Sequence, residues 1–439
     1  MTPFYDYMIP EFIQYWIQVG PWKFVRVFWY FVLFELTRYI TADFLIAGWY
    51  KIFSKDRKQK WQEAKQAFRN ENPFVSIIIP GKNEGPHLFK LTNSLAEQTY
   101  QNFELIIVDD GSDDQTPIIG RNLQKRGLID VFLRNDMRGG KASAANLALR
   151  FTKGKYIVHL DADCSFDRDA IENILIPFYL NENVGAVGGN VKVRNYRDSL
   201  CAKLQAIEYL KTISVGRIIA SQLGIYKIIS GAFGAFRADV IESIKGWDIG
   251  PGLDGDITVK IRKSGYDTVF EPTAVCLTNA PSKFRVLTKQ RLRWDKSIIR
   301  FRVRKHNDVY IPHEGFNWSN FFALLENVFY NVILDITWWI YVIDLLTNFN
   351  SSLKYIIPMN ITLYTIVGFL QMTSAYIYSE RRKEELYLWP YLPLMSIYTG
   401  TYLRMVRSIA YIQEFFFRKS YDDPWNPVKS SDQARENSF

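Results

Sequence analysis

The sequence predicts an α/β fold with a mostly parallel sheet, placed between helices that cross a membrane. Three observations predict it. Short β-branched apolar runs alternate with helical segments in the middle of the chain, long apolar stretches flank that region, and 16% of the 439 residues are aromatic. Alternating strands and helices are typical of parallel sheets, and aromatic side chains gather where membrane meets water. The mean hydropathy of −0.11 excludes a chain that is membrane-embedded throughout.

Residues 1–54 predict an N-terminal membrane segment. The apolar stretch 22–52 is long enough to cross the hydrocarbon core, which takes about 20 helical residues. Residues 4–19, interrupted by Pro10, fit an interfacial helix or a short extra span. Four charged residues of the long stretch must be paired or face other helices, because charge is costly in lipid: Arg26, Glu35, Arg38 and Asp43. A buried core helix of a soluble protein is the alternative.

Basic residues give the orientation of this segment. None precedes the apolar stretch, and "KDRKQKWQEAK" follows it. The positive-inside rule therefore places the region from residue 52 onward in the cytoplasm. The net charge of +9 favours partners that carry negative charge, such as anionic lipid, nucleic acid or phosphate-bearing substrates.

Residues 70–282 predict a cytoplasmic α/β domain. Four runs read as strands: "FVSIIIP", "FELIIVDD", "KYIVHLDAD" and "VGAVGGNVKV". Four segments between or after them read as helices: 87–99, 116–126, 141–153 and 169–180. Such continuous apolar strands suit a sheet that is covered on both faces.

The C-terminal part predicts a return to the membrane. Residues 283–315 form basic amphipathic helices at the membrane surface, and residues 316–420 form a membrane region. Within the membrane region, 317–347 and 354–378 are each long enough to span, and 386–403 is a re-entrant segment or a third span. The polar tail 421–439 is expected to be disordered.

Polar clusters follow the predicted strands, where ligands bind in open α/β sheets. They are "PGKNE" with Glu84, "DDGSDD" with Asp109 and Asp110, "GGK" with Lys141, and "DADCS" with Asp161 and Asp163. A single such cluster is usually a turn or a helix cap. Four in one domain predict a binding site.

The Asp161-Ala162-Asp163 pair predicts a metal site. Two carboxylates aimed the same way are hard oxygen ligands for Mg2+ or Mn2+, which take the rest of their shell from water and substrate phosphates. Asp109 and Asp110 are candidates for a base or ribose contact on a nucleotide. Lys141, behind two glycines, is a candidate for a base or phosphate contact.

Two further loops carry candidate residues. Asp254 and Asp256 lie in "PGLDGDITVK" at a predicted helix start, where capping is the ordinary role and a general base is the functional one. Ser230 and Gly231 open the small-residue loop "SGAFGAFR", which suits close approach to a ring-shaped ligand or a tight packing loop.

The segment "QRLRWDKSIIRFRV" places Gln290, Arg293 and Trp294 on a basic amphipathic helix. A basic surface helix and a nucleic-acid patch are the alternatives. We expect no nucleic-acid partner, because two segments long enough to span a membrane follow directly.

Together these motifs, in this order, resemble the processive family 2 glycosyltransferases, the class of the cellulose, hyaluronan, chitin and poly-N-acetylglucosamine synthases. The resemblance implies a GT-A fold over about residues 75–320, and a nucleotide-diphosphate sugar as donor. It implies a nucleoside or nucleotide contact for Glu84, Asp109, Asp110, Lys141 and Asp161, and the metal for Asp163. It implies diphosphate or acceptor contacts for Ser230, Gly231, Gln290, Arg293 and Trp294.

The base motif departs from the family pattern. Counting back from "VFEP" places the catalytic aspartate on Asp254, with Leu253 where an acid is common, and Asp256 is the rival.

The resemblance as a whole implies a multi-pass inner-membrane hexosyltransferase that polymerises a β-linked polysaccharide from a UDP-sugar or similar donor. It also leaves room for a helper subunit or a homo-oligomer. A non-processive enzyme with a lipid acceptor and a catalytically dead export subunit are the alternatives.

Overall fold

The computed structural model describes residues 5–42, 54–250, 252–314, 316–379, 381–423 and 426–437. The chain divides into two compact units. One, the helical unit, comprises Met1–Lys51 and Phe329–Ser408, and the other, the sheet unit, comprises Ile52–Val328 and Ile409–Phe439.

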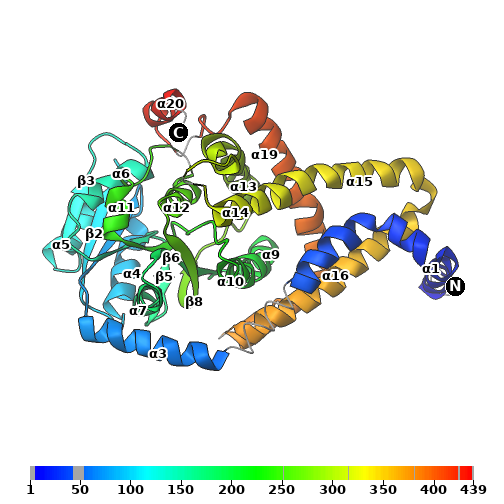
Figure 1. Cartoon of the computed structure of the whole chain (residues 1–439), viewed down its shortest axis with the longest axis horizontal. Helices are drawn as coiled ribbons and strands as arrows, with labels where there is room; N and C mark the ends of the chain where they lie inside the picture. The colour runs from blue at the N-terminus through cyan, green and yellow to red at the C-terminus, as the bar shows by residue number, and fades with distance from the viewer. Residues whose placement is uncertain are drawn as a thin grey trace. The chain divides into compact units, whose positions relative to one another are not determined.

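The sheet unit is built around one sheet, in which the described residues form eight strands in the order β3-β2-β1-β4-β7-β6-β8-β5 (Figure 1). The strands are β1 (Val75–Gly81), β2 (Phe103–Asp109), β3 (Val131–Arg134), β4 (Tyr156–Leu160), β5 (Ser165–Phe166), β6 (Val184–Val193), β7 (Phe233–Arg237) and β8 (Asp267–Thr278). Among these strands, the pairs β1–β2, β1–β4, β2–β3 and β6–β8 are parallel, and β4–β7, β5–β8 and β6–β7 are antiparallel. The sheet is therefore mixed, with four parallel and three antiparallel pairs among the described strands, where the sequence predicts a mostly parallel one.

The four predicted strands are confirmed as β1, β2, β4 and β6, each buried along its apolar run. Sequence reasoning missed the other four for local reasons. β7 is the Gly- and Ala-containing "FGAFR", which reads as a loop, and β8 is interrupted by Pro272. β3 and β5 span only four and two residues. Because β7 runs antiparallel between β4 and β6, missing it hid the mixed character of the sheet.

Helices pack around the sheet, and the predicted helical segments are confirmed in α4 to α8. The helices before and within the first half of the sheet are α3 (Ser54–Glu71), α4 (Gly85–Ala96), α5 (Thr116–Lys125), α6 (Lys141–Leu149), α7 (Ala170–Leu175) and α8 (Pro177–Leu180). Those that follow are α9 (Leu200–Tyr209), η2 (Leu210–Val215), α10 (Gly216–Gln222), α11 (Ala238–Ser243), α12 (Leu253–Lys263), α13 (Phe284–Ile298), η3 (Ile299–Lys305), η4 (Asn307–Tyr310) and α14 (Trp318–Val328).

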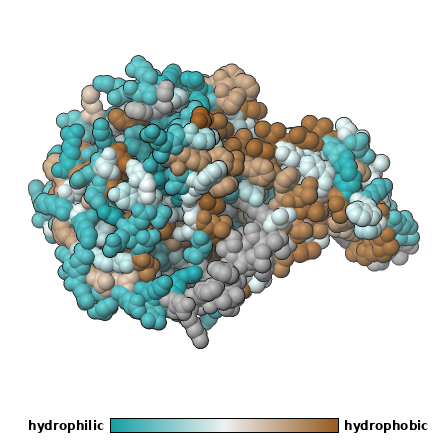
Figure 2. Space-filling view, in the orientation of Figure 1, coloured by the Kyte–Doolittle hydropathy of each residue, from teal (hydrophilic) through white to brown (hydrophobic). Residues whose placement is uncertain are grey.

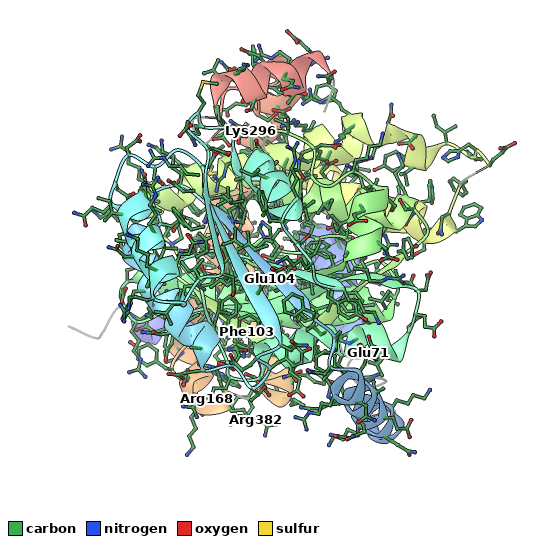
Figure 3. All side chains as sticks on the ribbon, turned by 90° about the vertical axis from the view of Figure 1, so that its left-hand side faces the viewer. Glu71, Phe103, Glu104, Arg168, Lys296 and Arg382 are labelled. Carbon is green, nitrogen blue, oxygen red and sulfur yellow. The ribbon has the colours of Figure 1, made fainter. Side chains whose placement is uncertain are left out.

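A buried polar network fixes the turn that leads into β4. The Ser76 hydroxyl donates to Glu104 Oε1 at 2.6 Å and accepts the Gly154 N–H at 2.9 Å. The Lys153 N–H donates to the same Glu104 oxygen at 2.8 Å. Figure 3 labels Glu104 on its strand inside the sheet unit. The network ties β1, β2 and the start of β4 together without leaving these polar groups unpaired.

The helical unit contains α1 (Tyr5–Val27), η1 (Phe31–Ala42), η5 (Phe329–Ile333), α15 (Leu334–Asn348), η6 (Asn350–Ser352), α16 (Leu353–Tyr378), α17 (Arg382–Leu386), η7 (Trp389–Leu394), α18 (Met395–Ile397), η8 (Tyr398–Tyr402) and the first part of α19 (Leu403–Phe417). Two helices among the described residues are long and apolar enough to cross a membrane: Trp318–Asn348 and Asn350–Tyr378. Apolar side chains gather on α15 and α16 in Figure 2, while hydrophilic ones dominate the visible face of the sheet unit.

Two ion pairs join charged side chains within the described part of the helical unit. Glu35, only 7% exposed, binds Arg404, and Arg26 binds Asp344 through two hydrogen bonds of 2.5 and 2.8 Å. The end of the predicted stretch 22–52, including Asp43, lies outside the described residues, as does the side chain of Arg38.

The expectation of a disordered C-terminal tail is wrong. Residues Val428–Glu436 form helix α20, and Ser430, Ser431 and Ala434 are buried. The polar composition misled the prediction because the buried face of α20 consists of small serine and alanine side chains. Such side chains allow close packing without apolar bulk.

We expect Gly154→Ala to destabilise the sheet unit by about 1–3 kcal/mol. A Cβ at this position would clash with the backbone of Val75 and Ser76, which cannot move aside without disturbing β1. Thermal unfolding of the detergent-solubilised protein measures the loss. Gly216→Ala is the matched control, because its Cβ would meet only the Lys211 carbonyl at 3.4 Å and alanine favours the helix. An equal stability for both variants would contradict the prediction.

Candidate functional site

The register of the sheet brings the polar strand ends to one edge. Gly81 at the end of β1 lies opposite Asp109 at the end of β2, and β4 runs parallel to β1 on its other side. Glu84 follows β1, and Asp161 follows β4 directly. The carboxyl ends of parallel strands form the usual ligand-binding edge of an open α/β sheet.

Lys141 opposes a group of acidic side chains at this edge. Its ammonium group forms an ion pair with Asp161, and the charges of Asp161 and Asp254 raise the pKa of Lys141 against the effect of burial. Burial and the nearby carboxylates of Asp161 and Asp163 raise the pKa of Glu84 to about 7. These five residues come from four separate segments of the sequence. In the structure they lie close enough for their charges to shift the pKa values of Glu84, Lys141 and Asp254.

The donor set at Asp161 and Asp163 fits a divalent cation. Asp163 has only weak side-chain contacts: Cys164 Sγ lies 3.5 Å from Oδ1 and Thr278 Oγ1 lies 3.4 Å from Oδ2. Within the described residues no group of three or more His, Cys, Asp or Glu side chains could enclose a metal. Mg2+ and Mn2+ accept this arrangement because they keep waters and bind substrate phosphates beside one or two carboxylates.

Asp110 holds a glycine loop in place. Its carboxylate accepts the N–H groups of Gly139 and Gly140, both at 2.8 Å, and the Asn135 amide at 3.0 Å. Gly140 has φ of +89° and directly precedes α6, so it sets the direction in which Lys141 leaves the loop.

Asp109 is buried beside this loop, and its Oδ1 accepts hydrogen bonds from the Ser112 backbone and hydroxyl. Its Oδ2 accepts no hydrogen bond from the described residues, and Arg134 Nε lies 3.7 Å away. A buried carboxylate oxygen without a hydrogen bond is a candidate acceptor for a ligand group.

Asp254 lies against the small-residue loop before β7. Gly252, with φ of +86°, precedes α12, and a Cβ on Gly231 would overlap the Asp254 carboxylate. Burial raises the pKa of Asp254, while Lys141 and the Gly231 N–H act in the opposite direction. The structure thus brings Asp254 and Gly231 together. Ser230 Oγ, by contrast, accepts the Ala232 N–H at 3.3 Å and stabilises its own loop.

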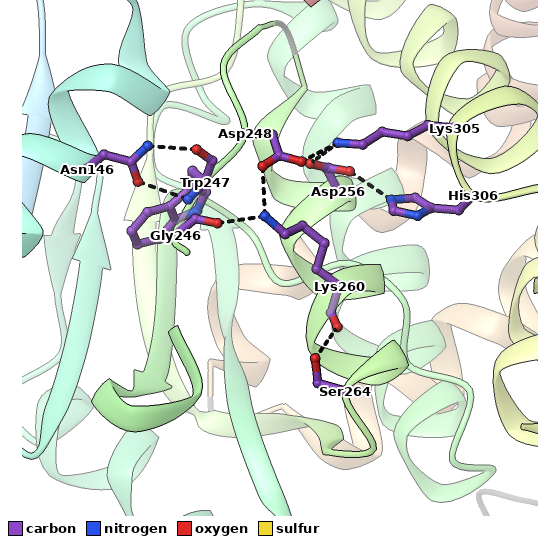
Figure 4. Close-up of polar contacts among 9 residues, drawn as sticks. All are labelled: Asn146, Gly246, Trp247, Asp248, Asp256, Lys260, Ser264, Lys305 and His306. Carbon is purple, nitrogen blue, oxygen red and sulfur yellow. Dashed lines mark hydrogen bonds and ion pairs between the residues drawn. The ribbon is translucent and has the colours of Figure 1, made fainter. Parts of the chain in front are cut away.

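Asp256 is engaged elsewhere, in the polar network of Figure 4. It is 2% exposed, and its two oxygens accept hydrogen bonds from Lys305 and His306, both at 2.8 Å. Burial acts to raise the pKa of Asp256, but the His306 and Lys305 interactions hold it below its usual value. Lys305 also binds Asp248, which in turn binds Lys260. This network joins η3 to α12.

His159 is a residue that sequence reasoning missed. Its Nδ1 lies 2.7 Å from the Gly231 carbonyl oxygen, and burial lowers its pKa to about 3, so the ring is neutral near pH 7. The neutral ring donates its Nδ1–H to that carbonyl and fixes the loop that contacts Asp254. A polar residue inside the apolar run "YIVHL" was the available signal.

The helix α13 carries Gln290, Arg293 and Trp294. Trp294 is 38% exposed, and the guanidinium of Arg291 lies 4.7 Å from its ring centre. Arg291 is itself held by Glu208 of α9 through hydrogen bonds of 2.8 and 2.9 Å. Glu208, which sequence reasoning missed, therefore fixes the cation that backs the tryptophan ring. Gln290 Oε1 is buried with no hydrogen-bond partner among the described residues.

The same helix approaches the start of α12. A Cβ on Gly252 would fall 3.1 Å from Ser297 Cβ and 2.6 Å from the Phe301 ring. Ser297 donates its hydroxyl to the Trp294 carbonyl at 2.6 Å. The part of the chain about one turn after Trp294 thus packs against Gly252, which lies two residues before Asp254.

We expect Asp256→Asn to destabilise the protein by about 3–5 kcal/mol, because it removes the buried carboxylate that binds both His306 and Lys305, of which Lys305 still binds Asp248. Chemical denaturation followed by circular dichroism measures the loss. The matched control is Asp254→Asn, which removes a carboxylate whose ionisation burial disfavours and should keep or raise stability. Similar losses in both variants would contradict the distinction between the two aspartates.

We expect Glu208→Gln and Arg291→Gln to be coupled by about 1–3 kcal/mol, because the pair is bidentate and buried. In a double-mutant cycle on unfolding free energy, the double variant should lose less than the two single variants together. Strict additivity would show that Glu208 and Arg291 do not interact in the way described.

Comparisons with known proteins give the relatives of this chain. Residues 76–245 match the family model "Glycosyl transferase family 2". The chain is 28% identical over 258 residues to a poly-beta-1,6-N-acetyl-D-glucosamine synthase of Staphylococcus epidermidis, covering 58% of this chain and 62% of the relative. A synthase of the same name from Staphylococcus aureus is 28% identical over 276 residues, covering 61% and 64%. The chain thus matches less than two thirds of the length of these relatives.

Among solved structures, a mannosyltransferase from Pyrobaculum calidifontis in complex with GDP-Man and Mn2+ aligns with a TM-score of 0.54 and 22% identity. The alignment covers 78% of this chain and 87% of the other. This likeness shows a GT-A-like fold, as the resemblance in the sequence implied.

Proposed function

We propose that this chain, which carries a glycosyl transferase family 2 domain over residues 76–245, is an inverting and processive glycosyltransferase. It would polymerise a β-linked polysaccharide from a nucleotide-diphosphate sugar. The observation that carries the proposal is the cluster of Lys141, Asp161, Glu84 and Asp254, coupled at the carboxyl edge of the sheet. The relatives named poly-beta-1,6-N-acetyl-D-glucosamine synthases make UDP-N-acetylglucosamine the first donor to test.

Asp254 would be the general base. Its carboxylate would take the proton from a hydroxyl of the acceptor sugar, and the freed oxygen would attack the anomeric carbon of the donor. The bond from that carbon to the diphosphate would break on the opposite face, so the configuration inverts. Burial favours this role, because a raised pKa makes Asp254 a stronger base than an ordinary aspartate. Asp256 is poorly suited, because Lys305 and His306 occupy its oxygens.

The nucleoside diphosphate leaves with the electron pair of the broken bond, and cationic groups would stabilise it. Asp163, with Asp161, would hold Mg2+ or Mn2+, which when bound neutralises charge on the diphosphate. Arg293 would contact the diphosphate, and Lys141 the nucleotide. Asp109 Oδ2 accepts no hydrogen bond from the described residues, which supports a nucleoside contact, whereas Asp110 would act by holding the glycine loop.

Trp294 would support the acceptor. Its ring is partly exposed and backed by Arg291, which leaves a flat apolar face for a pyranose. Gln290, Ser230 and Gly231 would complete the acceptor and diphosphate side of the pocket. A stacked platform suits a polymer that must stay bound between transfers.

The protein would be a multi-pass protein of the inner membrane, with the catalytic domain at 70–282 in the cytoplasm and interface helices at 283–315. The two long apolar helices and the paired charges of the helical unit support this placement. The polymer would leave through the membrane region 316–420, together with 1–54. A helper subunit or a second copy would complete the exit path, which the mass of the solubilised particle tests.

Turnover of a nucleotide-sugar panel tests the function. The purified full chain, with Mn2+ or Mg2+, should release nucleotide from one donor and make products of many lengths. A single-sugar glycolipid would instead support the non-processive alternative, and no release from any donor would support a catalytically dead export subunit. Asp163→Ala and Asp254→Asn should each lower kcat at least about 100-fold while the protein stays folded. Normal polymerisation by either variant would refute the role assigned to that residue.

We expect the acid limb of the pH profile of kcat to report Asp254. The base acts only when ionised, so activity should fall as the pH drops through a pKa above the usual 3.8 of an aspartate. Steady-state rates between pH 4 and 8 measure this limb. An acid limb at or below pH 3.8 would contradict the environment of Asp254 described above.

A further inference from the structure

The C-terminal segment, meaning residues 420–423 and 426–436, lies against both glycine loops of the proposed donor site. On one side, Ser430 donates its hydroxyl to the Gly139 carbonyl at 2.8 Å. A Cβ on Gly140 would fall 3.3 Å from both Asn426 Oδ1 and Pro427 Cδ, so the segment abuts this loop directly. On the other side, Ala434 Cβ would lie 2.9 Å from a Cβ on Gly250, which belongs to the loop that leads to Asp254.

The segment is anchored at its start as well. Glu414 accepts the Ser420 N–H at 2.7 Å and also binds Arg304 of η3. The guanidinium of Arg300 lies 4.4 Å from the centre of the Tyr421 ring. These contacts hold residues 420 and 421 against the helix that follows the Gln290–Trp294 motif.

Lys296 gives a further link between the segment and α13. Burial lowers the pKa of Lys296, while Asp423 and Asp422 of the segment act to raise it. Figure 3 labels Lys296 beside the C-terminal helix. One short segment therefore touches the Gly139–Gly140 loop before Lys141, the Gly250 loop before Asp254, and η3, which directly follows α13.

We propose that this segment is part of the donor site, with Ser430 as a positioning residue for the Gly139–Gly140 loop, which would contact the nucleotide. The Gly139 and Gly140 N–H groups hold Asp110, and the loop ends at Lys141. Ser430 fixes the remaining polar group of Gly139, its carbonyl, so the loop is held from both sides. This inference rests on the proposed function, because it assigns the segment to nucleotide binding. A fixed loop binds its ligand without first losing conformational freedom.

The chain offers a matched control. Ser431 is buried next to Ser430 on α20, but its hydroxyl has no hydrogen-bond partner among the described residues. Ser430→Ala and Ser431→Ala thus remove the same atom from neighbouring buried positions, and only the first removes a contact with the loop.

The test measures KM for the nucleotide sugar, kcat and the Kd of UDP for the full chain and both variants. We expect Ser430→Ala to raise KM and the Kd about three- to tenfold, the loss of one hydrogen bond, with kcat within twofold of the unaltered chain. Ser431→Ala should match the unaltered chain. Truncation after residue 425 should raise KM further, and an added peptide of residues 426–439 should partly restore it.

Unchanged KM and Kd in Ser430→Ala would overturn the inference, as would an equal rise in Ser431→Ala. In both cases the proposed function stands, because the unaltered chain still turns over its donor. A chain that binds UDP but turns over no nucleotide sugar would overturn the proposed function, and the Kd comparison would still decide the role of Ser430. A fall in thermal stability without a change in KM would show a merely structural role.

Discussion

The ion pair between Lys141 and Asp161 is the interaction on which the site depends. It joins the first residue of α6 to the end of β4, and it places a cation among Asp161, Asp163, Glu84 and Asp254. Without that charge, the carboxylates would repel one another in a partly buried space. The sheet register supplies the positions, because parallel β1, β2 and β4 end at the same edge.

Two aspartates two residues apart on α12 show how small differences in surroundings separate roles. Asp254 faces Gly231, where the absence of a side chain leaves room for its carboxylate. Asp256 faces the other way, into a network that ties η3 to α12. His159 supports the position of Asp254 by holding the Gly231 carbonyl. The site is thus shaped by close backbone approach as much as by charged side chains.

The sequence was enough to predict what depends on local pattern. The strands β1, β2, β4 and β6 are recognisable as apolar β-branched runs. Once they are placed, the acidic residues that follow them are expected at the sheet edge. The sequence could not reveal features that depend on distant partners. β7 forms a strand because β4 and β6 lie on either side of it. Glu208 acts by holding Arg291. Helix α20 packs through Ser430 and Ala434 against the loops at Gly139 and Gly250.

The place of α20 in the chain has a consequence for biosynthesis. A ribosome makes residues 426–437 after both apolar helices, Trp318–Asn348 and Asn350–Tyr378, have been translated. The glycine loop of residues 139–140 therefore gains its contact with Ser430 only after both apolar helices have been translated. During synthesis the loop lacks this restraint while the rest of the sheet unit up to Val328 is already made.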